Sequence, residues 1–439
     1  MKDAKLVSNG LLYHFGLPMR QPKIILTSRD YSLSLFYSDV LAGITVAMVA
    51  LPLSLAIAIA SGADPAKGLV TAIVGGFFIS LLGGSRVQIG GPTGAFIVVV
   101  FDVISTHGYD GLVLASLMAG IILLVAGYFR VGRLIRYIPD AVVNGFTIGI
   151  GIIIATSQIK DFMGMKLASE PADFIDKIPA LFHASDTASL SAVGIALFTL
   201  VLIVLLRWAF PRFPGLVVAI AAGSALVMFF SLDVDTIGSR FGELPSTLPM
   251  PQLPDISISR INELFPSALI IAFLAGVESL LSAMVADRMI NGHHRPNAEL
   301  LAQGAANIAS ALMTGLPATG AIARTATNIK AGGKTPVAGI VHAIVILLVM
   351  LVAAPLAGHL AMPALAALLM LTAWNMCEVR KWGEYWRGRR SDLILLLLTL
   401  SLTVLVDLTV AIGVGVSAGL ALRLSRRKAI DSDWHTPER

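Results

Sequence analysis

Long apolar runs follow one another through most of the chain, separated by short polar or glycine- and proline-containing segments. A helix that crosses a bilayer needs about 20 mostly apolar residues. Reading the runs in this way predicts about 14 transmembrane segments, some of them short. Their expected cores are 38–60, 68–84, 92–106, 110–127, 137–157, 190–207, 213–231, 264–286, 298–312, 319–330, 336–354, 357–375, 391–406 and 408–423.

The composition agrees with a chain that has lipid as its solvent. Of 439 residues, 56% are hydrophobic and 13% are charged, and the mean hydropathy is +0.82. Soluble domains carry about 25% charged residues. The single cysteine, Cys377, excludes a disulfide framework and a cysteine metal site. The sequence therefore predicts an all-α polytopic membrane protein.

Lysine and arginine predict its orientation, because cytoplasmic loops collect them. If both termini are cytoplasmic, the inside segments hold 25 of the 32 basic residues, the outside segments hold six, and Arg324 falls within the membrane. The formal net charge of +5 is then explained by topology, and no nucleic-acid partner is expected. We expect an integral membrane protein with an even number of spans.

The domain organisation follows from the same pattern. We expect a cytoplasmic N-terminal segment over residues 1–37 and one transmembrane transport domain over 38–423. Its two halves cover about 38–231 and 264–423, and residues 424–439 form a short cytoplasmic tail. With seven spans in each half, an odd number, the second half must insert upside down.

Two stretches are poor continuous helices, residues 90–96 (GGPTGAF) and 315–322 (GLPATGAI), and both contain Thr-Gly-Ala. They occupy the third span of each half, where paired interruptions indicate a transporter's midplane site. A helix that begins inside the membrane leaves N–H groups unpaired, and these attract anions. The alternative is that Gly and Pro only allow tight packing. The residues expected to bind substrate here are Thr93, Gly94, Ala95, Gly320 and Ala321.

A few polar side chains fall within the apolar spans. Arg324, with Ala323 before it, follows the second break and would add positive potential to the site; otherwise it extends to the interface. Glu278 is the only acid in its span and could carry a proton or bind sodium, with Ser282 one turn away; otherwise it is a static partner of an arginine. Ser54 either faces the cavity or bonds to the backbone.

These motifs resemble those of the sulfate-permease (SulP) family of anion transporters. The similar stretches are residues 39–47 (DVLAGITVA), 51–56 (LPLSLA), 90–95 (GGPTGA), 316–325 (LPATGAIART) and 332–335 (GGKT). The resemblance covers about residues 35–423. It implies a uracil-permease-like fold of inverted seven-helix repeats, with a core domain that moves against a gate domain, and a homodimer in the bacterial inner membrane.

The resemblance also implies roles for individual residues. Arg324 would contact the anion, and Glu278 and Ser282 would bind the coupling ion. The chain departs from many relatives at Leu53 and Ile57, where they carry a glutamine and an aromatic residue, so the expected pocket is less polar. Most relatives continue into a cytoplasmic STAS domain, which we do not expect here.

The expected function is therefore secondary active transport of a small anion, with a proton as co-substrate and an elevator mechanism. Sulfate, bicarbonate and a C4-dicarboxylate all remain open as the substrate. The alternatives are a sodium–bicarbonate symporter and an uncoupled exchanger or channel. The sequence has no nucleotide-binding loop and no catalytic or zinc motif, so we expect no enzyme activity, no cofactor and no metal.

Overall fold

The structure is a computed structural model that describes residues 21–28, 31–133, 139–167, 171, 174–210, 214–379, 382–406 and 408–425. Helices make up almost all of the regular structure in these ranges. The first long helix begins at Leu33, before the expected start of the first span at residue 38. Most of the expected N-terminal segment and of the tail 424–439 lies outside the described residues, so these domain limits stay predictions.

The first half of the chain forms the expected series of spans. Its third and fourth spans are both in α6, which Gly108 divides by adopting a φ of 71°. The elements are α2 (Lys23–Thr27), α3 (Leu33–Ala60), α4 (Pro65–Val70), a π-turn (Thr71–Gly75), α5 (Gly76–Leu82), β1 (Gly90–Gly91), a 3-10 turn (Gly94–Phe96), α6 (Ile97–Tyr128), α7 (Asp140–Met163), α8 (Phe174–His183), α9 (Leu190–Ala209) and α10 (Gly215–Phe229).

The second half repeats this order of elements after the short helix α11. A short helix again follows the fifth span, as α8 follows α7 in the first half. The elements are α11 (Ile237–Phe241), α12 (Ile258–Ile290), α13 (Pro296–Leu312), β2 (Thr319–Gly320), α14 (Ile322–Lys330), α15 (Val337–Ala357), α16 (Met362–Met376), α17 (Trp382–Arg387), α18 (Arg390–Leu405) and α19 (Leu408–Ser425). Seven of the described helical stretches are long and apolar enough to cross a membrane.

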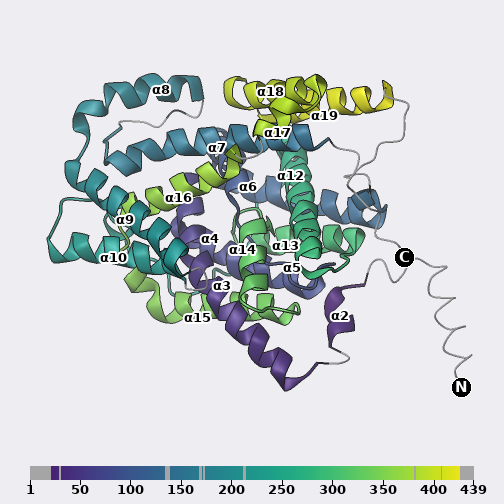
Figure 1. The fold of residues 1–439 in the computed structure, drawn as a ribbon, viewed down its shortest axis with the longest axis horizontal. Helices are drawn as coiled ribbons and strands as arrows, with labels where there is room; N and C mark the ends of the chain where they lie inside the picture. The colour runs from purple at the N-terminus through teal and green to yellow at the C-terminus, as the bar shows by residue number, and fades with distance from the viewer. Residues whose placement is uncertain are drawn as a thin grey trace, which may run out of the picture.

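The helices pack into two groups (Figure 1). The core group comprises α3, α4, α5, α6, α12, α13, α14 and α15. The gate group comprises α7, α9, α10, α16, α18 and α19, and extends along the left and top of the view. Helix α3 packs against α10 and α16, so the first span joins the two groups. The predicted core and gate domains therefore correspond to two bodies with separate internal packing.

Within the core group, α6 and α13 cross at a pair of glycines. A Cβ atom on Gly304 would lie 2.8 Å from the Gly120 carbonyl oxygen and 2.7 Å from Cγ of Leu124. A Cβ atom on Gly120 would lie 2.9 Å from the Gly304 carbonyl oxygen. Two backbones that approach this closely exclude any side chain, as in other membrane helix pairs with small residues at the crossing.

We predict that Gly304→Leu lowers the free energy of unfolding by about 1–3 kcal/mol, because the added side chain forces α6 and α13 apart. The matched control is Gly194→Leu on α9, where an added Cβ meets nothing within 4 Å. Thermal unfolding in detergent, followed by size-exclusion chromatography, measures both. Equal melting temperatures for the two variants would contradict the close crossing.

Candidate functional site

The two interrupted segments meet as a two-stranded antiparallel ladder in the core group. β1 pairs with β2, with Gly90 opposite Gly320 and Gly91 opposite Thr319. The Ala321 N–H extends the ladder by donating to the Ile89 carbonyl at 2.9 Å. Segments more than 200 residues apart in the sequence are thus joined through their backbones. The pairing satisfies polar groups that the hydrocarbon cannot.

The unwound chain before α14 is held by side chains from neighbouring helices. The Asn307 amide bonds both backbone groups of Ala318, donating to its oxygen at 2.8 Å and accepting from its nitrogen at 2.9 Å. Thr71, at the start of the π-turn, accepts the Leu316 N–H at 2.6 Å. Thr319 donates to the Ala275 carbonyl at 2.9 Å. The break is therefore a built feature of the fold, with its backbone groups individually satisfied.

Helices begin close to both strands and leave amide groups without acceptors. Thr93 and Ala321 are the N-cap residues, both extended, and neither side chain caps its helix. Among the described residues, the structure gives no acceptor for the N–H groups of Gly94, Ala95, Ile322 or Ala323. Two helix N-termini thus present free donors beside one ladder, an arrangement that favours a bound anion.

Arg324 adds a positive charge next to these donors. Its side chain is 1% exposed, and Nη2 donates to Ser54 Oγ at 3.1 Å, while Nε and Nη1 have no partner among the described residues. A Cβ atom on Gly91 would lie 2.1 Å from Nη1, so a side chain at this position would force the guanidinium to move. Arg324 forms no ion pair with a carboxylate among the described residues.

Ser54 forms the backbone hydrogen bond that its sequence position left as one alternative, and it also contacts Arg324. It is fully buried, donates to the Ala50 carbonyl at 2.7 Å and accepts from Arg324. Ala323, by contrast, has an exposed side chain, so it can contribute to the site through its N–H group.

Glu278 lies beside the first helix start. Its Oε2 accepts from Thr93 Oγ1 at 2.7 Å, and the side chain is half-buried. Within the described residues Oε1 has no hydrogen-bond partner. Glu278 is hydrogen-bonded to Thr93 and, among the described residues, not to an arginine. It therefore does not form the static ion pair that the sequence left as an alternative.

Ser282 lies one turn from Glu278 but contacts a different element. Its hydroxyl is 3.3 Å from Thr325 Oγ1 on α14, and Thr325 in turn accepts the Ile89 N–H at 3.1 Å. The structure therefore brings Ser282 to the ladder without a hydrogen bond to Glu278. Thr325 belongs to this cluster and was missed from sequence; its place one position after Arg324 was the available signal.

The acid Glu299 was also missed from sequence. It is fully buried and accepts from the Gly84 N–H at 2.9 Å, Ser279 Oγ at 2.8 Å and Gln303 Nε2 at 3.0 Å. Ser279 also accepts from Gln88 Nε2 at 2.8 Å, and Gln88 precedes β1. An acid in the first turn of a helix ordinarily interacts with the positive end of the helix dipole. The sequence position of Glu299 therefore did not indicate that it connects other elements. Each of these three groups donates a hydrogen bond to Glu299, so its carboxylate connects three segments of the core group.

No three His, Cys, Asp or Glu side chains in the described ranges are arranged as metal ligands. What the site offers is free backbone N–H groups, one guanidinium, and one carboxylate with an open oxygen. These groups suit the reversible binding of a small anion. Together with the all-helical membrane fold, they define the class of protein as a membrane anion transporter.

The chain belongs to the sulfate permease family, whose model matches residues 36–399, and it is thus a transporter and not an enzyme. It is 43% identical to YvdB of Bacillus subtilis, provisionally named a sulfate transporter, over 84% of this chain and 70% of that protein. The chain spans 60–70% of the length of the curated relatives that it matches first.

Solved structures confirm the predicted fold. The transmembrane domain of a cyanobacterial bicarbonate transporter, BicA, has a TM-score of 0.78 at 30% identity, covering 87% of this chain and 99% of that one. The murine Solute Carrier 26 family member A9 anion transporter, in the inward-facing state, has a TM-score of 0.84 at 17% identity, covering 96% and 74%. The likeness to the murine protein is one of fold.

We predict that Arg324→Ala weakens anion binding by about 10- to 150-fold, since hydrogen bonds to charged groups contribute about 1.5–3 kcal/mol. Ser54→Ala is the matched control, because it removes one acceptor of the guanidinium and leaves the charge. Binding of sulfate and bicarbonate to purified protein measures both variants, after chromatography has shown that they fold. Wild-type affinity in Arg324→Ala would remove this residue from the site.

Proposed function

We propose that the chain is a secondary active transporter that carries a small anion together with a proton, and that its core group moves against its gate group as an elevator. One observation supports this proposal above the others. Glu278 accepts a hydrogen bond from Thr93, the N-cap residue of the first helix start. The N–H groups of the next two residues, Gly94 and Ala95, have no acceptor among the described residues. The coupling group and the anion donors are therefore neighbours.

The proposed substrates are sulfate or bicarbonate, with C4-dicarboxylates as a further class to test. Backbone N–H groups and a guanidinium recognise oxyanion oxygens, and they discriminate weakly between anions of similar size. Ile57 is buried and Leu53 is half-buried, so the first span adds no polar group at these positions. Relatives are named for sulfate and for bicarbonate transport, which agrees with a site of this kind.

The proposed proton coupling is based on the repulsion between the Glu278 carboxylate and the bound anion. An ionised Glu278 would repel an anion held at the neighbouring N–H groups. At a separation of about 6 Å and an effective dielectric constant of about 20, two like charges repel by about 3 kcal/mol. A proton on Glu278 removes that repulsion, and the open Oε1 can accept it. Anion binding and protonation then favour each other, as thermodynamic linkage requires.

Sodium is the second candidate for the coupling ion. Ser282 lies one turn from Glu278 on α12, and its hydroxyl is 3.3 Å from that of Thr325; oxygen atoms of this kind can coordinate a small cation. In this structure the two hydroxyls contact each other, Thr325 also accepts the Ile89 N–H, and Glu278 contacts Thr93. A bovine relative, 29% identical, is named a sodium-independent sulfate anion transporter. We therefore place the proton first.

We predict that Glu278→Gln abolishes uptake driven by a proton gradient, while anion exchange at equal pH persists, because the amide mimics a neutral carboxyl. Labelled sulfate, bicarbonate and fumarate in proteoliposomes, under a proton gradient, a sodium gradient or neither, measure this. Ser282→Ala is the control and should keep proton-driven uptake.

The same experiment distinguishes the alternatives. Uptake that requires sodium and is lost in Ser282→Ala would replace the proton by sodium. Rapid anion flux that is the same with and without either gradient, and that is unchanged in Glu278→Gln, would identify a channel or an uncoupled exchanger.

We further propose that the chain is a homodimer of the bacterial inner membrane with both termini cytoplasmic. The distribution of lysine and arginine between alternate loops supports the orientation. It places the loop around Ser185 outside and α17 inside.

We predict opposite labelling by a membrane-impermeant maleimide in intact cells. In a Cys377→Ser background, Ser185→Cys should react at once and Gly383→Cys only after lysis. Both positions are exposed, so access depends on side and not on burial. The reverse pattern would invert the topology.

A further inference from the structure

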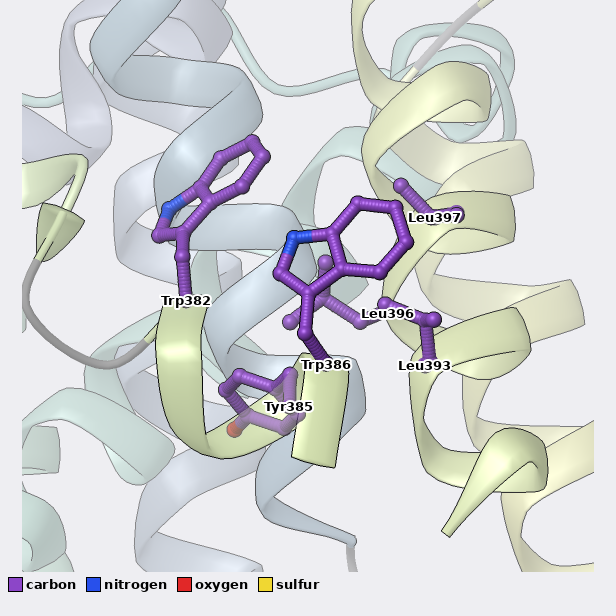
Figure 2. A pocket seen from close by; sticks show the side chains of 6 residues that line it. All are labelled: Trp382, Tyr385, Trp386, Leu393, Leu396 and Leu397. Carbon is purple, nitrogen blue, oxygen red and sulfur yellow. The ribbon is translucent and has the colours of Figure 1, made fainter. Parts of the chain in front are cut away.

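An apolar groove lies between α17 and α18, in the gate group (Figure 2). Figure 2 shows the Trp386 indole pointing toward the leucines of α18. The residues that line the groove are Trp382, Tyr385, Trp386, Leu393, Leu396 and Leu397. The surface of the groove is almost entirely apolar. Ile394 on α18, next to the lining leucines in sequence, is 65% exposed and adds to the apolar surface of that helix.

Two of the three aromatic side chains are fixed by hydrogen bonds, and the third is free. Trp382 Nε1 donates to the Cys377 carbonyl at 3.0 Å. The Tyr385 hydroxyl accepts from Asn144 Nδ2 on α7. Trp386 is 66% exposed, and its indole N–H has no partner among the described residues. One tryptophan thus presents both an apolar ring and an unused donor at the edge of the groove.

Basic side chains surround the same short helix. Arg387, Arg389 and Arg390 are exposed, and none has an acidic partner in the part of the chain that the structure describes. In the sequence, Arg380 and Lys381 come just before α17; their placement lies outside the described residues. An apolar groove with an adjoining cluster of unpaired arginines matches a molecule with an apolar chain and an anionic head.

The inverted repeat supplies an internal comparison. Helix α8 holds the equivalent position in the first half and also exposes apolar side chains, including Phe182 at 77%. Its one lysine, Lys177, is 3% exposed and donates to Ser157 at 2.9 Å. The exposed arginine cluster, at the end of α17 and the start of α18, is therefore found in the second half and is not a property of the repeat. In the proposed orientation, α17 is the helix on the cytoplasmic side.

We propose that the α17–α18 groove binds an anionic phospholipid of the cytoplasmic leaflet. An acyl chain lies across Trp386 and the α18 leucines, and the phosphate lies among Arg387, Arg389 and Arg390. Trp386 supplies the indole N–H at the boundary between head and tail, where tryptophan is enriched in membrane proteins. The assignment to the cytoplasmic leaflet depends on the proposed orientation of the chain. The proposal that the groove binds a lipid does not depend on the proposed transport function.

Bound lipid would hold the gate group at a fixed depth. α17 connects α16 to α18, and both of these helices pack against α7. An elevator needs one body that stays in place while the other moves. A charged lipid attached to the gate group would oppose its vertical movement and leave the core group free.

The test uses the purified full chain in mixed micelles of phosphatidylglycerol and phosphatidylcholine. Native mass spectrometry measures the ratio of the two lipids retained, and photoreactive analogues of both map the contact. We expect preferential retention of phosphatidylglycerol and cross-links within residues 382–397. Arg387→Gln/Arg389→Gln/Arg390→Gln should lower the retention ratio by about tenfold or more, since each basic residue contributes to anionic-lipid attraction.

The matched control removes three other exposed basic residues of the core group, as Arg288→Gln/Lys330→Gln/Lys334→Gln, and should keep the wild-type ratio. Trp386→Ala should reduce cross-linking by both lipids at α18 while keeping the preference for the anionic one. Equal retention of the two lipids by the wild type, cross-links elsewhere, or an equal loss in the control triple would overturn the proposal. None of these outcomes depends on which anion is transported or on Glu278.

Discussion

The arrangement of the core group depends on satisfying backbone polar groups at two breaks within the membrane. Hydrocarbon offers no hydrogen bonds, so each N–H and C=O of an interrupted helix needs a partner in the protein. The β1–β2 ladder provides some of these partners, and Asn307, Thr71 and Thr319 provide others. The groups that remain open are the N–H donors of the two helix starts. The constraint that fixes the fold thereby leaves a site for an anion.

Arg324, Glu299 and Glu278, all in the core group, differ in what surrounds them. Within the described residues, Arg324 has two nitrogens without hydrogen-bond partners and forms no ion pair. Glu299 is enclosed by donors, so its carboxylate is locked in place. Glu278 has one donor and one open oxygen. Of these two acids, Glu278 is the one with an oxygen left open, which is the basis of the proposed proton coupling.

In the proposed elevator mechanism, the two helix groups have different mechanical roles. The core group is joined by the ladder and by close crossings such as that of Gly120 with Gly304, so it can move as one body. The gate group exposes many apolar side chains, and the exposed arginines lie at the end of α17 and the start of α18. Helix α3 packs on both groups and lies where any relative movement must occur.

The sequence by itself determined the membrane class, the number and approximate limits of the spans, and the two breaks, because length, apolar periodicity and Gly/Pro placement are local properties. It also marked Arg324 and Glu278, since a charge within an apolar run is conspicuous. Only the tertiary structure decided which groups meet: Thr93 with Glu278, Ser54 with Arg324, and Ser282 with Thr325. Glu299 escaped notice because an acid near a helix start looks like an ordinary cap until its donors, Gly84, Ser279 and Gln303, converge on it from distant positions. Contacts of this kind depend on how inverted halves pack together, and that packing leaves no local signature in the chain.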